Sequence, residues 1–587
     1  MAMDLAWIES ALAELGVRRM LLAIHGPSFP SDPDEDVGRG APGTRAAGRL
    51  FALARQLGFT GIQLGPEGQT SRTNASPYDG TIFSRDIGAI TLGTFAELVP
   101  AAMLEGAVEH RDLVRTDHRR AYDVTHALVA AAAATLPARP ALAARVAAFR
   151  AHHAGWLERD ALYEALSASR HDAGYRHWSR DADLWIDDTP ARVARRAELA
   201  HEHAVAIERF TVGQLLAHEQ HARVRALTER LGLALYGDLQ VGFSDRDAWS
   251  RAAAFLPGYA MGAPPSRTNP EGQPWGYPVL HPDQLQPGGG AFELVRARLH
   301  KGLSEYDSLR LDHPHGLVCP WVYKTDGDPA RSVRAGARLF ESPDLLDHPR
   351  LARFAIARAG QLDRTQPRHG DDWVIALEPD QVARYATLMD VVVAAARQHG
   401  RDPSDLSCEV LSTMPRPLRA VVKGLALGRW RVSQKANLDD VNDVYRSENA
   451  NPADWVMLGN HDTRPIFAVV ADLSRDAHDR WARHLAARLA LAPADTARLA
   501  EPGFLATAML AELFVCRAEN VSIFFADLFG YTERFNTPGL VDDVANWSLR
   551  LPHTFAELYA SRLARGQALD LPLALRLALA ARKAGAR

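Results

Sequence analysis

Eight short apolar runs alternate with longer helical segments along this chain, and this alternation constrains its fold more than any other feature. The runs are rich in β-branched or apolar residues, as buried strands are, and they cover residues 19–24, 60–64, 234–243, 306–312, 405–410, 430–434, 455–459 and 521–526. Segments between them, such as 40–57 and 416–425, repeat apolar residues at helical spacing. Parallel strands joined by helices produce this order, and eight of them fit a closed barrel. We therefore predict the α/β class, with a (β/α)8 TIM barrel that carries large helical insertions on its rim.

The chain is long for a barrel of this kind. Its 587 residues exceed the roughly 250 of a bare barrel, so we predict one (β/α)8 domain over 1–587 that carries insertions. The largest insertion is predicted at 100–231, a segment rich in Ala, Arg, Glu and His whose apolar positions recur at three- and four-residue steps. A second insertion is predicted at 328–403, between barrel strands four and five.

Composition and charge argue against several classes of partner. The 67 Lys and Arg residues nearly balance 71 Asp and Glu, giving a net charge of −4, and no basic stripe with interleaved aromatic residues is present, so we expect no nucleic-acid partner. No apolar stretch is long enough to span a membrane, and residues 1–16 read as an amphipathic helix rather than a secretion signal. Cys319, Cys408 and Cys516 are too few and too far apart for a disulfide framework. We therefore predict a cytoplasmic protein with no membrane partner.

Metal and cofactor chemistry has little support in the sequence. Histidine pairs such as His218 and His221 have ligand-like spacing, but a metal site also needs convergent ligands from a second element. A phosphate-binding loop motif is absent as well. We predict neither a metal nor an organic cofactor.

Three acidic residues stand at the ends of predicted barrel strands. Asp312 ends the fourth run, Glu409 lies at the end of the fifth, and Asp462 follows the seventh. Carboxyl ends of barrel strands open at one mouth, where barrel enzymes keep their chemistry, so the three acids are expected to converge there. Arg310, two residues before Asp312, is placed to keep that carboxylate ionised, whereas the apolar surroundings of Glu409 favour a raised pKa. A set of carboxyls in these two states suggests glycosidic-bond chemistry.

Sequence motifs in a fixed order resemble those of one family. They comprise GFTGIQLGP at 58–66, SPY at 76–78, YGDL at 236–239, DAW at 247–249, GAPP at 262–265, GQPWG at 272–276, RLDH at 310–313, GNHD at 459–462, NTPG at 536–539 and NWSLR at 546–550. Each motif is weak alone, but their joint order is specific. The chain resembles the 4-α-glucanotransferases of the amylomaltase and disproportionating-enzyme type, glycoside hydrolase family 77, through nearly the whole barrel.

The resemblance implies roles for the three acids. Asp312 would be the nucleophile, Glu409 the general acid/base and Asp462 the carboxylate that stabilises the transition state, with Arg310 and His461 beside them. A rival acid/base is Glu378, because residues 373–380 also read as a strand that contains a glutamate. We favour Glu409, since Pro415, a helix and the run at 430–434 follow it at the spacing of the family's motif.

The substrate implied by the resemblance is an α-1,4-glucan or maltooligosaccharide, with a sugar as acceptor. Sugars bind to aromatic platforms and to polar groups that take up hydroxyls. The sequence offers a set of both kinds, which we predict to bind substrate: Tyr78, Trp275, Asp238, Arg310, Asn460, His461 and Gln434. Trp275, surrounded by glycine and proline, is expected on a surface loop.

The chain departs from the usual family pattern at five positions close to the motifs, namely Ser266, Pro314, His315, Val410 and Thr463. The three acids are nevertheless present. We therefore expect a retaining 4-α-glucanotransferase that disproportionates maltooligosaccharides through a covalent glycosyl-Asp312 intermediate. Two alternatives stay open, a related α-glucan hydrolase or transglycosylase with another acceptor, and a catalytically silent glucan-binding protein.

Overall fold

Eight parallel strands form the largest sheet of the computed structural model, which describes residues 4–111, 113–171, 174–178, 183, 185, 188–266, 269–539 and 545–585. Their order in the sheet is β10-β11-β12-β1-β2-β3-β6-β9. The bounds are β1 Arg19–Ile24, β2 Gly61–Leu64, β3 Ala234–Leu239, β6 Ser308–Leu311, β9 Ser407–Cys408, β10 Trp430–Val432, β11 Trp455–Met457 and β12 Asn520–Phe524. Each strand overlaps one of the eight predicted runs, and the predicted (β/α)8 barrel is confirmed.

The sheet curls into a nearly closed barrel. Its two end strands, β9 and β10, approach each other closely enough for the Trp430 indole N–H to donate to Ser407 Oγ over 2.8 Å. All neighbouring strands run parallel, for example with Leu22 of β1 opposite Ile62 of β2 and Ile523 of β12. Because every strand points the same way, all eight carboxyl ends open at one mouth.

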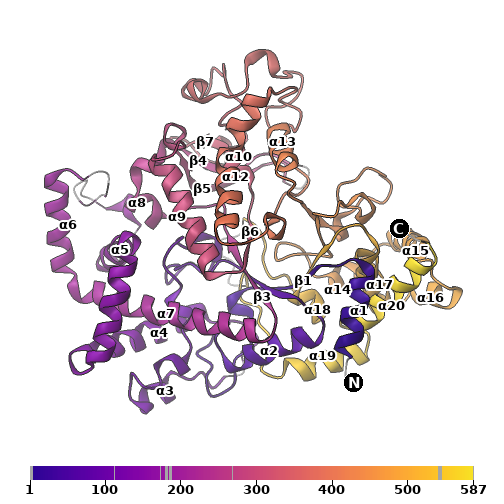
Figure 1. Ribbon diagram of the computed structural model, residues 1–587, viewed down its shortest axis with the longest axis horizontal. Coiled ribbons are helices and arrows are strands. Elements are labelled where there is room, and N and C mark those ends of the chain that lie inside the picture. Colours follow the sequence, from indigo (N-terminus) through magenta and orange to yellow (C-terminus); the bar gives the residue numbers. More distant parts are fainter. Residues whose placement is uncertain are drawn as a thin grey trace.

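Helices surround the barrel, as Figure 1 shows. Six of the seven connections between consecutive barrel strands contain α-helix, whereas 433–454, between β10 and β11, contains only short 3-10 turns. The helices that pack on the barrel or close its ends are α1 Leu5–Leu15, α2 Arg45–Gln56, α7 Ala204–Arg230, α9 Gly290–Glu305, α12 Pro379–Gln398, α13 Arg416–Gly424, α17 Pro502–Val515 and α20 Leu571–Lys583. Further helices lie between the strands or after β12: α8 Asp245–Ser250, α10 His315–Val318, α11 Pro329–Arg334, α14 Ile466–Ala471, α15 Arg475–Arg488, α16 Pro493–Arg498, α18 Phe525–Leu528 and α19 Phe555–Ala564. Among the described residues, no helix combines the length and the apolar character needed to cross a membrane.

The long connection from β2 to β3 is helical. It contains α3 Ala101–Ala107, α4 His118–Ala134, α5 Pro140–Ser169 and α6 Pro190–Glu202 before α7 returns the chain to the barrel. The helices α5 and α7 pack along each other, and the group lies to one side of the barrel in Figure 1. This region covers the predicted insertion at 100–231. In the predicted insertion at 328–403, α12 packs against the neighbouring helices α9 and α13.

A second, antiparallel sheet was not predicted. It has four strands in the order β5-β4-β7-β8, with bounds β4 Phe255–Ala263, β5 Gln273–Leu280, β7 Trp321–Lys324 and β8 Ala337–Arg338. The prediction of a surface loop around Trp275 is wrong, because Trp275 lies in β5, which pairs with β4 through Met261 and Tyr277. Gly272, just before β5, and Gly276, within it, both have a positive φ, a conformation that favours glycine.

Candidate active site

Two of the three predicted acids emerge side by side at the mouth of the barrel. Asp312 directly follows β6 and Glu409 directly follows β9, and these neighbouring strands are in register, with Leu311 opposite Cys408. The Glu409 backbone N–H donates to Leu311 O over 2.9 Å, which extends the ladder to the first residue beyond the strand. Carboxylate oxygens of Asp312 and Glu409 lie within 4.8 Å of each other.

The guanidinium of Arg310 holds the acids together. Arg310 points inward from β6 and is buried. Its Nη2 donates to Asp312 Oδ1 over 3.0 Å and also to Glu409 Oε2, while its Nη1 donates to Tyr78 Oη over 3.0 Å and to Asp238 Oδ2. One cation therefore contacts three carboxyl groups and a phenol.

Asp312 and Glu409 have opposite pKa shifts. Burial disfavours the charge on Asp312, but the adjacent Arg310 guanidinium and a hydrogen bond from His313 outweigh it and hold the pKa of Asp312 well below its usual range. Burial also raises the pKa of Glu409, and there the attraction of Arg310 and His313 does not overcome it. The surroundings thus favour the ionised form of Asp312 and shift Glu409 toward its protonated form, a division suited to a nucleophile and an acid.

Asp462 lies on the loop that follows β11. Its Oδ1 accepts a hydrogen bond from Asn536 Nδ2 over 2.6 Å, and its backbone N–H donates to Asn460 Oδ1 over 3.1 Å. Burial raises the pKa of Asp462, which the hydrogen bond from Asn536 and the charge of Arg310 partly offset. Asn536 comes from a distant part of the chain and fixes the direction of this carboxyl.

Aromatic rings line the mouth around Tyr78 and His461. The two rings stack with centroids 5.3 Å apart and an interplanar angle of 18°. Trp547 lies 5.5 Å from Tyr78, and His25, at the end of β1, lies 4.9 Å from His461. Burial lowers the pKa of both histidines well below the usual value, so both rings are neutral. Gly65 makes room for His25, because a Cβ at this position would lie 2.1 Å from its ring.

Trp275 and the two predicted amides differ in how they face the mouth. The Trp275 ring is partly exposed and makes an edge contact with His313 at 5.2 Å. In contrast, Gln434 donates to Arg464 O over 3.1 Å, and the buried Asn460 holds the Asp462 backbone. The amides therefore support the loop that carries Asp462.

Glu378, the rival acid/base, lies on the surface. Residues 373–378 do not form a strand, and Val374 makes only an isolated bridge with Leu362, so the strand interpretation of this segment is wrong. The Glu378 side chain is 51% exposed and is ion-paired with Arg358 at 2.8 Å. It is the N-cap residue of α12, where its backbone N–H donates to Gln381 Oε1 over 2.9 Å.

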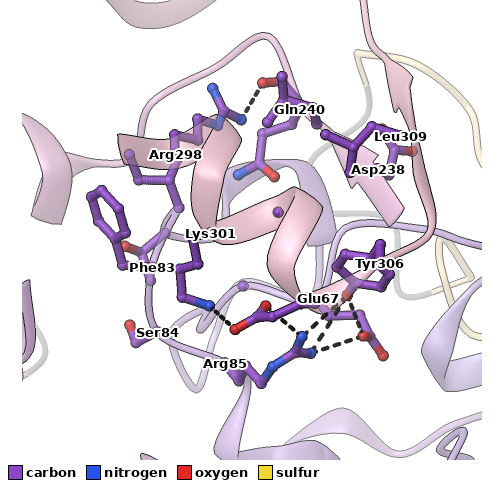
Figure 2. Close-up of a pocket in the computed structure, with 16 residues that line it drawn as sticks. Glu67, Phe83, Ser84, Arg85, Asp238, Gln240, Arg298, Lys301, Tyr306 and Leu309 are labelled. Carbon is purple, nitrogen blue, oxygen red and sulfur yellow. Dashed lines mark hydrogen bonds and ion pairs between the residues drawn. The ribbon is translucent and has the colours of Figure 1, made fainter. Parts of the chain in front are cut away.

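A polar cavity of about 60 Å³ lies behind Asp238 (Figure 2). Asp238 presents Oδ2 to Arg310 and Tyr78 and also lines the cavity, whose opposite wall contains Arg85, paired with Glu67 and Glu305. Burial raises the pKa of Asp238 to about 7, partly offset by Arg310. Asp238 therefore contacts Arg310 of the site and also borders the cavity.

Two groups in the described part of the chain have the spacing of metal ligands. One is Asp312, His313 and Glu409, and the other is Glu448, His484 and Glu512. Arg310 contacts the two acids of the first group, and Arg488 lies 3.9 Å from Glu512 in the second. In each group an arginine guanidinium already balances the negative charge of the carboxyls, so neither group fits a divalent cation well.

The sequence did not point to four residues of the mouth as functional. These residues, which contact the predicted ones, are His25, His313, Asn536 and Trp547. The last three lie inside the sequence motifs RLDH, NTPG and NWSLR, but no role was predicted for them. His313 and Trp547 share a further signal, a positive φ of 41° and 60°, which only the backbone geometry shows.

Comparison with known proteins places the chain in a family. The family model for 4-α-glucanotransferases of glycoside hydrolase family 77 matches residues 24–555, and the chain belongs to this family. A chloroplastic or amyloplastic 4-α-glucanotransferase of Oryza sativa subsp. japonica is 28% identical over 308 residues, 49% of this chain and 50% of the relative. A 4-α-glucanotransferase of Thermus thermophilus is 30% identical over 207 residues, 33% of this chain and 40% of the relative. The alignments thus span half or less of these relatives.

Solved structures resemble the chain over a greater length. An amylomaltase from Streptococcus agalactiae, solved in complex with acarbose, aligns with a TM-score of 0.72 at 16% identity, covering 94% of this chain and 100% of that one. An amylomaltase from Corynebacterium glutamicum aligns with a TM-score of 0.65 at 17% identity, covering 97% and 77%. At these identities the likeness shows the fold.

Proposed function

We propose that the protein is a retaining 4-α-glucanotransferase that disproportionates α-1,4-glucans or maltooligosaccharides. The observation that carries the proposal is the pair of carboxyls bonded to Arg310 Nη2, one with a lowered and one with a raised pKa. Their oxygens lie within 4.8 Å of each other, which fits the roughly 5–5.5 Å spacing of retaining enzymes better than the 6.5–9.5 Å of inverting ones. Family membership supports the substrate class.

In the proposed first step, Asp312 attacks the anomeric carbon of the donor. The bond from that carbon to the glycosidic oxygen breaks, and the oxygen takes the proton of Glu409 as it leaves. A covalent glycosyl-Asp312 ester results. The Val241 backbone N–H donates to Asp312 Oδ2 over 3.0 Å and Arg310 donates to Oδ1, so both oxygens are held in place before the attack.

In the second step, a sugar hydroxyl attacks the same carbon. Glu409, now ionised, accepts the hydroxyl proton, and Asp312 leaves as a carboxylate. Asp462, whose carboxyl accepts the hydrogen bond from Asn536, would stabilise the positive charge that develops on the sugar ring in both steps. The partly exposed Trp275 and the ring pair of Tyr78 and His461 supply platforms for sugar faces.

The donor and the acceptor belong to the proposal as well. The Streptococcus agalactiae amylomaltase binds acarbose, which supports a sugar-binding mouth in a barrel of this fold. Three buried free cysteines fit a reducing compartment, and we propose a cytoplasmic location on that basis.

Incubation with maltotriose tests the proposal. Disproportionation yields glucose together with oligosaccharides longer than maltotriose, and chromatography of the products separates these outcomes. Glucose and maltose alone would mean that water is the acceptor, which would favour the hydrolase. Unchanged substrate with tight binding would favour a glucan-binding protein.

A further inference from the structure

The ring of His313 faces both acids at once. His313 follows Asp312 directly and has a φ of 41°, in the left-handed region that residues other than glycine rarely adopt. Its Nδ1 lies 3.5 Å from Asp312 Oδ1 and 3.6 Å from Glu409 Oε2. A strained backbone at such a position indicates that the surrounding structure enforces the placement of the ring.

Neighbouring groups hold this ring. The edge contact with Trp275 has a centroid distance of 5.2 Å and an interplanar angle of 81°. On the other side, His315 lies 5.8 Å away and places its Nε2 2.9 Å from Thr413 O. Since Thr413 belongs to the loop after Glu409, His315 ties the loop of one acid to the loop of the other.

The groups around His313 make it a cation. Asp312 and Arg310 face it from β6 and the following loop, Glu409 from the end of β9, and His461 from the loop after β11. Burial opposes the charge on His313, but the bonds to Asp312 and Glu409 outweigh burial and raise its pKa to about 10. In contrast, burial and the nearby His313 lower the pKa of His315 to about 3. One imidazolium thus faces the acids, with neutral histidines beside it.

Negative charge moves between the two acids during the proposed reaction. When Asp312 becomes an ester, it changes from a carboxylate to a neutral group, and Glu409 changes from an acid to a carboxylate as it gives up its proton. The pair carries one negative charge before and after this step. A cation bonded to Asp312 alone would lose its partner, whereas the donors of Arg310 and His313 lie against both acids.

We propose that His313 is a positioning residue whose Nδ1–H follows the negative charge from Asp312 to Glu409, stabilising the nucleophile in the first half-reaction and the base in the second. This inference rests on the proposed function. It assigns His313 a role that requires contact with both carboxyls, and it explains why the residue after the nucleophile keeps an unfavourable backbone conformation.

The test is the pH dependence of kcat/KM for His313→Asn. Asparagine tolerates the left-handed region, so this change removes the cation with little change of backbone. Loss of a nearby positive charge raises the pKa of both carboxyls, and both limbs of the profile should move to higher pH by about one unit. His461→Asn, which removes a neutral imidazole from the same mouth, should lower the rate without moving the limbs. A His313→Asn profile that is lower but unshifted would refute the proposal.

A second measurement avoids dependence on the variant's rate. In protein with ¹³C-labelled histidine, the His313 resonance is identified as the NMR signal that is missing from His313→Asn. In the wild-type protein this resonance should still be that of an imidazolium at pH 8. In Glu409→Gln enzyme glycosylated on Asp312, neither acid is ionised, and this ring should lose its proton at a lower pH. Titration of the ring below pH 7 in the free enzyme would overturn the proposal. Failure of the wild-type enzyme to transfer glycosyl units from maltotriose would instead count against the proposed function.

Discussion

Asp312 and Glu409 contact the same nitrogen of Arg310, but their pKa values are shifted in opposite directions. Asp312 also accepts the Val241 backbone N–H, so both of its oxygens are bonded in the ionised state. Glu409 is more deeply buried, with 2% of its side chain exposed against 8% for Asp312. Two adjacent carboxyls of like charge ionise separately, and these differences decide that Asp312 loses its proton first.

Substitution of the acids tests their proposed roles. We expect Asp312→Asn and Glu409→Gln each to lower kcat by roughly three orders of magnitude or more, because each removes a group that acts on the reacting atoms and leaves the packing unchanged. Steady-state kinetics with maltotriose measures the loss, and circular dichroism checks the fold.

The matched control is Glu378→Gln, which alters a surface ion pair with Arg358. Its turnover should stay close to that of the wild type. If Glu378→Gln were as inactive as Glu409→Gln, the acid/base assignment would be wrong.

At the scale of elements, the loop that carries Asp462 is held by a buried carboxyl in α18. Asp527 Oδ1 accepts the backbone N–H of Ile466 over 2.6 Å, at the start of α14. Burial raises the pKa of Asp527 to about 7, partly offset by this hydrogen bond. The short helices α14 and α18 are therefore joined by a hydrogen bond to a carboxyl group that is protonated below about pH 7 and ionised above it.

The stability of the protein should depend on pH through Asp527. The folded-state pKa of about 7 lies above the ordinary value of 3.8, so between these values unfolding releases a proton and rising pH destabilises the fold. Asparagine keeps an acceptor for Ile466 but cannot ionise. We expect the melting temperature of Asp527→Asn, relative to that of the wild type, to rise between pH 5 and pH 8. The corresponding change in the difference between their unfolding free energies is on the order of a few kcal/mol at most.

Scanning calorimetry at the two pH values measures this effect. A suitable control is Asp570→Asn, since Asp570 also accepts a backbone N–H at the start of a helix, α20, but is only half-buried. A relative melting temperature of Asp527→Asn that stays constant from pH 5 to pH 8 would show that Asp527 is ionised in the folded protein throughout.

On the scale of the whole molecule, segments far apart in the chain close the structure. The helix α20 packs on both α1 and α17, so both terminal regions lie together (Figure 1). Arg550, from the NWSLR motif, donates to both oxygens of the Asp36 carboxylate over 3.2 and 2.8 Å. This buried bidentate pair fastens the chain after β12 to the connection that follows β1.

Removal of the Arg550 side chain should destabilise the protein strongly. Arg550→Ala leaves Asp36 largely buried without its counter-charge, and breaking such a pair costs about 3–5 kcal/mol. Arg358→Ala breaks an exposed pair with Glu378, which is worth about 0–1 kcal/mol. Thermal unfolding should give a clearly lower melting temperature for Arg550→Ala than for Arg358→Ala, and equal melting temperatures would contradict this account.

The amino-acid sequence by itself determined the barrel. Short apolar runs followed by amphipathic helices leave few other arrangements, because each strand must be buried on both faces. The positions of Asp312, Glu409 and Asp462 after strands four, five and seven followed from the same pattern. Residue order was enough here because parallel strands bring their ends to one mouth.

Only the tertiary structure decided which groups meet. The second sheet was missed because its pairing is between distant segments, and the Gly and Pro content of the Trp275 region resembles a loop. Local sequence made Glu378 look like Glu409, but their burial differs, which no local pattern encodes. The opposite pKa shifts of Asp312 and Glu409 and the bond from Asn536 to Asp462 likewise depend on residues brought together from separate parts of the chain. Burial and electrostatic contact are set by neighbours in space, and most of these neighbours are remote in sequence.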